Sequence, residues 1–373
     1  MGKWMARASV ALSMAIVSGN AGVSAEEKAP IRVAIVGLVH GHAHGLLRMM
    51  PENKNVKLVA IFEPQADLAI EYAKQYHLEA VPLYKDLENM LVEQKPDAVL
   101  VYTTIQDHRK VIEAAAKHGI SSMVEKPLST TLEDAIAIRT VARERQVRVL
   151  VNYETTWYAS NREVYDQAKQ GKLGDLRRIV VQDGHEGPKE IGVGPEWLPW
   201  LTDPVENGAG ALFDFGCYGA DLATVLMHGD APVSVMAVTQ TDKPEIYPKV
   251  DDEATVVLRY PKAQAVLMPS WNWPFSRKDM EVYGVSGYAI TAGSDRLRVR
   301  YAGEKAETTI RAAAVPAPES NSLDYLVGVL RGKIKPDGDP SSLETNMVVM
   351  QILDAARRSA ETGRAVSVTK LPR

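Results

Sequence analysis

Short apolar runs recur along the first 150 residues, and the segments between them carry apolar side chains at every third or fourth position. The runs predict strands at residues 31–36, 56–62, 97–102, 122–124 and 147–151, with a short strand near Val81. The segments 106–118 and 131–145 have the spacing of helices with one buried face. Strands that alternate with helices favour βαβ units, so we expect a parallel sheet over residues 30–152.

Beyond residue 153 most strand-like runs follow one another without a helix between them. They lie at residues 177–182, 233–239, 254–260, 263–268, 279–283, 288–292 and 297–301, and helical spacing recurs at 161–170, 323–330 and 342–361. This change predicts a second α/β domain over residues 153–373, which the long helix closes. One face of its sheet would stay open unless a second subunit covered it, so we expect a homo-oligomer through this sheet.

Length and charge bound the possible partners. A chain of 373 residues is too long for one ordinary core, which agrees with two domains. Its content of 46% hydrophobic and 24% charged residues is average for a globular protein. The formal net charge of −4 gives no support for nucleic acid or an anionic membrane as a partner.

The first 25 residues have the pattern of a secretory signal peptide. Lys3 and Arg7 precede an apolar stretch at 8–17, which is too short to span a bilayer, and Val23-Ser24-Ala25 offers a cleavage site. We therefore expect a periplasmic or secreted protein without a membrane span; the alternative is a buried N-terminal helix. Cys217 is the only cysteine, so no internal disulfide forms, and an apolar neighbourhood favours a core residue over a nucleophile.

A glycine-rich turn follows the first predicted strand. Residues 37–45 read Gly-Leu-Val-His-Gly-His-Ala-His-Gly, and a turn of this kind before a helix presents backbone N–H groups to a pyrophosphate. The spacing departs from G-x-G-x-x-G, because Val39 replaces the second glycine. Glu63 ends the second strand, where a carboxylate can accept ribose hydroxyls and repel a 2′-phosphate; this favours NAD over NADP. The candidate cofactor residues in this part are Gly37, Val39, His40, Gly41, His42 and Glu63.

Three histidines in this turn support an alternative. His-x-His after a strand is typical of metal-dependent amidohydrolases, and imidazole is a common zinc ligand. Such a barrel would need more ligands at later strand ends, yet the chain has only eight histidines, and His77 and His118 fall in helical segments. We expect no metal. The milder alternative is that His40, His42 and His44 are polar residues at a helix start, one or two of them near cofactor phosphates.

A charged pair ends the fourth predicted strand. In Ser122-Met123-Val124-Glu125-Lys126-Pro127-Leu128, the proline lacks a backbone N–H and so ends a central strand. Glu125 and Lys126 would then lie at the carboxyl ends of the strands, where open α/β sheets bind their ligands. The alternative is a surface ion pair worth ~0–1 kcal/mol.

These features together resemble the Gfo/Idh/MocA family of oxidoreductases. Glu125-Lys126-Pro127 matches a family motif, and residues 103–108 keep the Thr and His of its Thr-Pro-Asn-x-x-His. Residues 208–221 are similar to a glycine-rich family motif that ends in Asp-x-Gly-x-His-x-x-Asp. The resemblance implies a Rossmann domain, then an α/β domain with a large, mostly antiparallel open sheet, and substrates that are mostly sugars and polyols. It also implies cofactor contacts by Thr103, Thr104, His108, Glu125 and Lys126.

The same resemblance singles out Asp214 and Tyr218, which a four-residue spacing would put on one helical face. Most of the family has His where Tyr218 stands, although glucose–fructose oxidoreductases are similar to this chain in having Tyr. Lys126 would bond the reacting oxygen, with a pKa lowered beside oxidised nicotinamide, and would favour the phenolate of Tyr218. Tyr218 would exchange the proton, and Asp214 would orient the sugar. The alternative is that Asp214 caps a helix and Tyr218 packs.

Substrate contacts are expected in the second domain. The polar segment 183–189 follows a strand, and Trp197, Trp200, Trp271 and Trp273 are four of the six tryptophans. Tryptophan stacks well on the apolar faces of sugar rings, although core or interface packing is an alternative for each. The candidate substrate residues are His185, Trp200 and Trp273.

Three functions remain open. The first is an exported oxidoreductase that transfers hydride between a tightly bound nicotinamide cofactor and a sugar. The second is a glycoside hydrolase that uses bound NAD for transient oxidation and elimination. The third, a non-catalytic sugar-binding protein, is the least favoured, because Lys126, Asp214 and a proton-carrying Tyr218 are all present.

Overall fold

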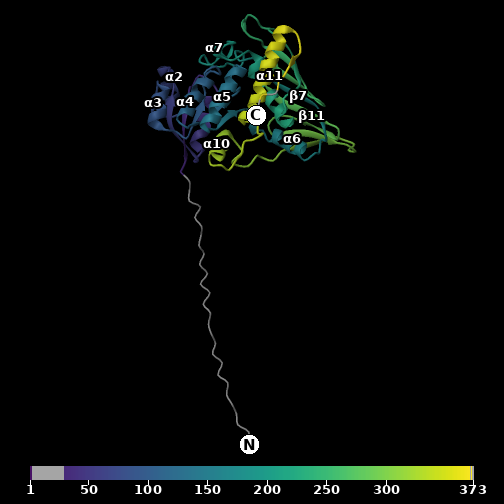
Figure 1. The fold of residues 1–373 in the computed structure, drawn as a ribbon, viewed down its shortest axis with the longest axis horizontal. Helices are drawn as coiled ribbons and strands as arrows, with labels where there is room; N and C mark the ends of the chain where they lie inside the picture. Colours follow the sequence, from purple (N-terminus) through teal and green to yellow (C-terminus); the bar gives the residue numbers. More distant parts are fainter. Residues whose placement is uncertain (2–28, 370, 372–373) are drawn as a thin grey trace.

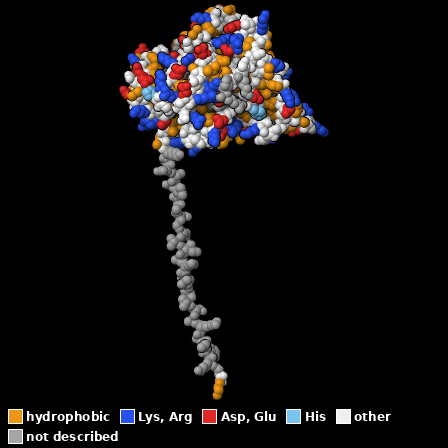
Figure 2. Space-filling view, in the orientation of Figure 1, with side chains coloured by type: hydrophobic (Ala, Val, Ile, Leu, Met, Phe, Trp, Pro, Cys, Tyr) orange, Lys and Arg blue, Asp and Glu red, His pale blue; other side chains and the backbone are white. Residues whose placement is uncertain are grey.

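The structure is a computed structural model that describes Met1, residues 29–369 and Leu371. The predicted signal peptide, apart from Met1, lies outside the described residues. Within the described part no helix is both long and apolar enough to cross a membrane. Lys, Arg, Asp and Glu side chains are interspersed over the face seen in Figure 2, without a broad region of one sign.

A six-stranded, all-parallel sheet occupies the first part of the chain, as expected. Its order is β3-β2-β1-β4-β5-β6, and its strands are β1 (Ile31–Val36), β2 (Val56–Phe62), β3 (Leu83–Tyr84), β4 (Ala98–Val101), β5 (Ser121–Glu125) and β6 (Val149–Asn152). The helices between them are α1 (Ala43–Met49), α2 (Ala66–Gln75), α3 (Leu87–Gln94), α4 (His108–Lys117) and α5 (Leu132–Arg145), with 3₁₀ turns at Met50–Glu52 and Glu154–Trp157. Helices on both faces explain why β4 and residues 33–36 of β1 are apolar at every position.

The second sheet has nine strands in the order β14-β13-β12-β11-β7-β10-β9-β8-β15. They are β7 (Leu176–Gly184), β8 (Ser234–Gln240), β9 (Glu253–Arg259), β10 (Gln264–Ser270), β11 (Arg277–Gly284), β12 (Gly287–Thr291), β13 (Arg296–Tyr301), β14 (Thr308–Arg311) and β15 (Val366–Ser367). Of its described pairs only β7 with β10 is parallel, so the expected mostly antiparallel sheet is confirmed.

Helices α9 (Gly216–Leu226) and α11 (Leu343–Thr362) cover one face of this second sheet. The remaining helices are α6 (Ala159–Lys169), α7 (Leu198–Leu201), α8 (Ala211–Asp214) and α10 (Ser322–Leu330). On β8, Val235 and Ala237 are buried beneath the helices, whereas Met236 and Val238 on the opposite face are 37% and 56% exposed. One face of the sheet therefore carries exposed apolar side chains.

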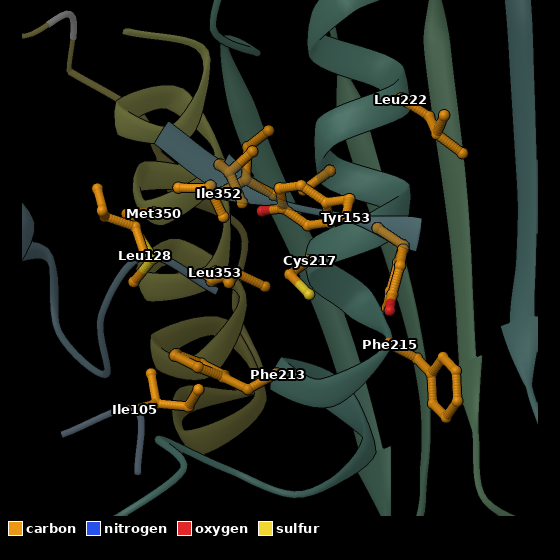
Figure 3. Packing of buried hydrophobic residues seen from close by; sticks show 14 of the residues in the cluster. Ile105, Leu128, Tyr153, Phe213, Phe215, Cys217, Leu222, Met350, Ile352 and Leu353 are labelled. Atoms are coloured by element: carbon orange, nitrogen blue, oxygen red, sulfur yellow. The ribbon is translucent and has the colours of Figure 1, made fainter. Parts of the chain in front are cut away.

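Helix α11, yellow in Figure 1, lies between the two sheets and packs against α5, α9 and β8. Its first turn is capped by Ser342, whose side chain accepts the Thr345 N–H, and its last turn ends at Gly363 with φ +64°. Leu353 on this helix lies near Ile105, Leu128 and Phe213 in the core shown in Figure 3. One apolar cluster thus joins both sheets and holds the site between them in place.

Candidate active site

The glycine-rich turn closes tightly against the end of β4. Gly37 has φ +84°, and a Cβ on it would lie 2.6 Å from Thr103 Cγ2 and 2.8 Å from Thr103 N. A side chain at this position would therefore clash with backbone as well as being strained. A cavity of about 950 Å³ begins at the turn, and its lining includes five of the predicted cofactor residues: Gly37, Val39, Glu63, Thr103 and Thr104.

Glu63 is bound to the backbone of the turn. Its Oε2 accepts the Leu38 N–H at 2.8 Å and its Oε1 accepts the Gln65 N–H at 2.9 Å. Burial raises the pKa of this carboxyl, and the two amide hydrogen bonds oppose the rise. A carboxylate has about four acceptor positions, so two remain for the hydroxyls of a ribose in the adjoining cavity.

Two tryptophans from the second part of the chain cover the turn. The ring of Trp197 is so near Gly41 that a Cβ there would lie 2.1 Å from Trp197 Cε3. Trp200 Nε1 donates to the Val39 carbonyl at 3.1 Å. The His40 ring lies against both, with centroids 4.8 Å and 5.3 Å away. Trp200 therefore packs on the turn, and its contact with a sugar stays a prediction.

Two of the three histidines in the turn lie beside Glu125. His42 Nδ1 and Glu125 Oε2 are 2.8 Å apart. One nitrogen of His40, one nitrogen of His42 and one carboxylate oxygen of Glu125, all atoms able to bind a metal ion, lie within 4.8 Å of one another. His44 instead stacks on Tyr72 at 4.6 Å. The amidohydrolase alternative is wrong, because β1 belongs to an open sheet rather than a barrel.

His108 and Glu125 are both buried at the carboxyl ends of the strands. His108 Nδ1 lies 3.2 Å from the Leu128 carbonyl, and burial lowers its pKa to about 4. Glu125 Oε1 accepts from Asn152 Nδ2 at 2.8 Å. Burial is the largest influence on the pKa of Glu125 and would raise it, but His42, Asn152 and Lys126 together lower it below the ordinary value.

Lys126 and Asp214 form the central ion pair, and each is less than a tenth exposed. Lys126 Nζ donates to Asp214 Oδ1 at 2.5 Å and to the Asp214 carbonyl at 3.0 Å. Burial is the largest influence on the pKa of Lys126 and would lower it, but Asp214, Cys217 and Glu125 together raise it above the ordinary value. Burial would likewise raise the pKa of Asp214, yet Lys126, His185 and Trp271 together lower it. Both groups are therefore charged. The lowering of the Lys126 pKa beside oxidised nicotinamide stays a prediction.

Asp214 and Tyr218 do not share one helix, so that prediction is also wrong. Helix α8 ends at Asp214 and α9 begins at Gly216, a residue type that weakens a continuous helix by ~1 kcal/mol relative to Ala. The Tyr218 N–H bonds the Phe215 carbonyl rather than that of Asp214. The freed Asp214 carbonyl accepts Lys126 Nζ and, at 3.3 Å, Cys217 Sγ. The break is thus what gives the lysine a backbone anchor.

Tyr218 lies beside two ammonium groups. Its ring centroid is 5.1 Å from Lys126 Nζ and 4.7 Å from Lys278 Nζ. Burial, and after it the nearby Glu154 carboxylate, raise its pKa well above the ordinary value. In this structure the protonated hydroxyl is therefore favoured. Cys217 is buried, and burial raises the pKa of its thiol, which agrees with the expected core residue.

Of the other predicted substrate residues, His185 lies in the site and Trp273 at its edge. The His185 ring is 4.8 Å from Phe215, which Figure 3 shows on the side of α9 opposite Phe213. His185 Nδ1 accepts the Gly187 N–H at 2.9 Å, which assigns its proton to Nε2. Burial lowers the pKa of His185. Trp273 packs on the backbone of Gly184.

Three further residues lie in the site but were not among the residues predicted for it from the sequence. Trp271 is fully buried and its Nε1 donates to Asp214 Oδ2 at 3.0 Å. Asp183 on β7 and Lys278 on β11 are register partners on the face that also buries Val181 and Met280. Strand alternation was the available signal, since it puts two charged residues on a buried face.

Comparisons with known proteins agree with this fold. Residues 31–153 match the family model described as "Oxidoreductase family, NAD-binding Rossmann fold", and residues 161–290 match "GFO/IDH/MocA C-terminal domain". A 1,5-anhydro-D-fructose reductase of Ensifer adhaerens is 25% identical, over 76% of this chain and 83% of the relative. A scyllo-inositol 2-dehydrogenase (NADP(+)) of Bacillus subtilis is 23% identical, over 88% and 96%.

Solved structures share the whole arrangement. An aldose-aldose oxidoreductase from Caulobacter crescentus, complexed with glycerol, superposes with a TM-score of 0.77 at 22% identity, over 91% of this chain and 99% of that one. An inositol dehydrogenase homolog from Azotobacter vinelandii, complexed with NAD+, gives 0.76 at 20% identity, over 91% and 97%. At these identities the likeness shows a common fold.

Proposed function

Because the chain belongs to the Gfo/Idh/MocA family of oxidoreductases and carries its NAD-binding Rossmann domain, we propose that it is an exported enzyme that transfers hydride between a tightly bound NAD and a sugar or sugar derivative. The observation that carries the proposal is the buried Lys126–Asp214 pair at the carboxyl end of β5. The names of the relatives, which act on sugars and polyols, support the substrate class.

The residues of the turn fit the adenosine and pyrophosphate parts of NAD. Gly37 lets the turn lie directly against Thr103, where any side chain would clash. Glu63 offers free acceptor positions at the cavity of about 950 Å³. The negative charge of Glu63 makes NADP the less favoured cofactor. When bound, NAD accepts or supplies the hydride.

The chain's own residues would handle the oxygen and the proton. Lys126 has three N–H donors and uses two on Asp214, so the third can bond the reacting oxygen. Tyr218 would give its proton to a carbonyl oxygen in the reduction. In the oxidation it would act as a phenolate, stabilised by the ammonium of Lys126, and take the proton of the substrate hydroxyl. Asp214, which accepts a hydrogen bond from Trp271, would keep Lys126 charged and orient its ammonium toward the reacting oxygen.

Replacement of Lys126 by Met tests this assignment. Turnover should fall at least ~100-fold while NAD still binds, because the methionine fills similar space but cannot bond the oxygen. Lys57→Met, on the exposed side of β2, is the matched control and should change nothing. Near-normal turnover in Lys126→Met would refute the assignment, and so would loss of NAD binding with an intact fold.

The glycoside hydrolase is the second candidate, favoured by the burial of Lys126 and Asp214, which would help to retain a transiently oxidised sugar. Purified protein would be offered nitrophenyl glycosides and free sugars. Release of nitrophenol without accumulation of NADH supports the hydrolase, whereas NADH formation from free sugars supports the oxidoreductase. Binding of sugar with neither reaction would leave the non-catalytic alternative.

Export and self-association belong to the same proposal. The pattern of residues 1–25 supports export, which fractionation of cells expressing the full chain or residues 26–373 would test. Exposed Met236 and Val238 on the open face of β8 support a homo-oligomer. Val238→Glu should dissociate it in light scattering, whereas Val92→Glu, at a 49% exposed position on α3, should not.

A further inference from the structure

Two buried aspartates have no hydrogen-bond partner on either carboxyl oxygen among the described residues. They are Asp183, which is 2% exposed, and Asp221, which is fully buried. A buried polar group without a partner costs about 1–3 kcal/mol, so each needs a reason to be there. Their surroundings differ, and the difference points to a ligand at only one of them.

Asp221 lies within α9, and burial is the one resolved cause of its raised pKa. No charged group contributes to that rise, which is the environment of an isolated acid in a core. Asp183 lies near the end of β7, opposite Lys278 across the ladder. Lys278, Asp279, Glu154 and Lys126 all act electrostatically on it. Asp183 is therefore an unpartnered acid beside the charged groups of the active site.

Lys278 connects Asp183 to the reacting groups. It is the register partner of Asp183, and its ammonium forms an ion pair with Glu154 while lying 4.7 Å from the Tyr218 ring centroid. One ion pair leaves an ammonium with donors to spare. The Lys278 side chain is 18% exposed and that of Glu154 is 52% exposed, so this side of the site leads out to solvent. Lys278, the register partner of Asp183, therefore lies on the side of the site that is nearer to solvent.

We propose that Asp183 and Lys278 form a second hydrogen-bonding subsite, which binds a sugar hydroxyl other than the one that is oxidised. A carboxyl group that keeps its proton both donates and accepts, as a hydroxyl does, and an ammonium adds a further donor. The sugar hydroxyl would supply the partner that Asp183 lacks. The inference rests on the proposed function, because it concerns the substrate of the same centre.

A site built to bond a hydroxyl strongly rejects the analogue without it, because its own polar groups are then left unpaired. We therefore expect one monodeoxy analogue to lose at least ~100-fold in kcat/KM relative to the parent sugar. Asp183→Val should reduce that ratio to less than about tenfold for this analogue alone, since residue and hydroxyl then no longer interact. Asp183→Asn, which can still donate and accept, should keep most of the ratio.

The experiment uses the NAD-loaded full-length protein. The sugar with the highest kcat/KM in a panel of hexoses, pentoses and inositols is compared with its monodeoxy analogues. Dissociation constants from calorimetry accompany the rates, so discrimination is measured even where turnover is slow. Asp221→Val, or Asp221→Asn if the first variant does not fold, is the matched control and should leave every ratio unchanged.

An equal loss for the parent and all analogues in Asp183→Val would show a structural role and overturn the inference, and so would an unchanged ratio. An altered ratio in the Asp221 control would overturn it as well. If no sugar of the panel binds the NAD-loaded protein, the proposed function fails and this inference fails with it. If sugars bind and react without the predicted loss of discrimination, only the inference fails.

Discussion

The two sides of the site differ in how their polar groups are bonded. On the side of the parallel sheet, Glu63 accepts two backbone amides and Glu125 is bonded to His42 and Asn152. On the side of the nine-stranded sheet, Asp183 has no partner on either oxygen. The two carboxylates of the cofactor side are thus held by hydrogen bonds, although Thr104 Oγ1 and His108 Nε2 on that side have no partner among the described residues. On the substrate side it is a carboxyl group, that of Asp183, that has none. Such a division suits a retained cofactor and an exchangeable substrate.

The largest effect should come from breaking the pair that joins the two sides. Asp214→Ala leaves a buried ammonium with only a backbone carbonyl, which should cost about 3–5 kcal/mol of unfolding free energy. Urea denaturation measures the loss. The double variant Lys126→Met with Asp214→Leu is the control, because it removes both charges. If the double variant is no more stable than Asp214→Ala, the pair is not what the single change breaks.

The next effect is a loss of stability at low pH that His108, on the cofactor side, should cause. The fully buried His108 has a pKa lowered to about 4, against ~6.5 in the unfolded chain, so its stabilising contribution is present above pH 6.5 and is lost as the pH falls to about 4. The loss should amount to roughly 3 kcal/mol. His108→Gln should flatten the dependence of unfolding free energy on pH in that interval. An unchanged slope would mean that other groups carry the acid sensitivity.

Gly37→Ala tests the rigidity of the cofactor side. The positive φ and the contact with Thr103 predict a loss of about 2 kcal/mol in stability, together with weaker NAD binding. Gly45→Ala is the matched control, because nothing lies within 4 Å of its Cβ position and α1 favours Ala by up to ~1 kcal/mol. NAD titration and thermal unfolding follow both. Equal behaviour of the two variants would contradict the tight turn.

Trp271→Phe is the smallest change, and it sharpens the comparison from the substrate side. The ring would remain while the hydrogen bond to Asp214 Oδ2 is lost, so we expect turnover to fall about tenfold, or ~1.4 kcal/mol. NAD affinity should not change. Trp157→Phe, whose indole bonds Asn152 instead, serves as the control. A fall in NAD affinity with unchanged turnover would show that Trp271 acts on the cofactor side and would contradict the prediction.

The two sheets could be predicted from the sequence. Strands that alternate with helices indicated the parallel sheet, and successive strand-like runs indicated the mostly antiparallel one. The placement of Gly37, Glu63 and Glu125 also followed, since they lie at strand ends that a parallel sheet brings to one edge. The placement of Trp200 did not follow. Its indole bonds Val39, a contact between residues 161 positions apart that no local pattern contains.

The break between α8 and α9 shows the same limit. A four-residue spacing predicts one helix. Gly216 disfavours its continuation, and the tertiary bond from Lys126 to the Asp214 carbonyl, which the spacing does not reveal, favours two. Asp183 and Lys278 could have been found as charges on the buried face of a strand. What they contact depends on pairing across the sheet, which spacing along the chain does not specify.

The break also has a consequence for how this centre can change. Substitution can remove the Asp214 carboxylate or the Tyr218 hydroxyl, but it cannot remove the main-chain carbonyl that also binds Lys126. A change at Asp214 keeps this backbone bond but loses the carboxylate, at the stability cost predicted for Asp214→Ala. A change at position 218 leaves both bonds from Lys126 to Asp214 in place. Exchange of Tyr218 for His would then alter proton transfer in a protein that still folds, which makes this position the natural one for redirecting the enzyme by directed evolution.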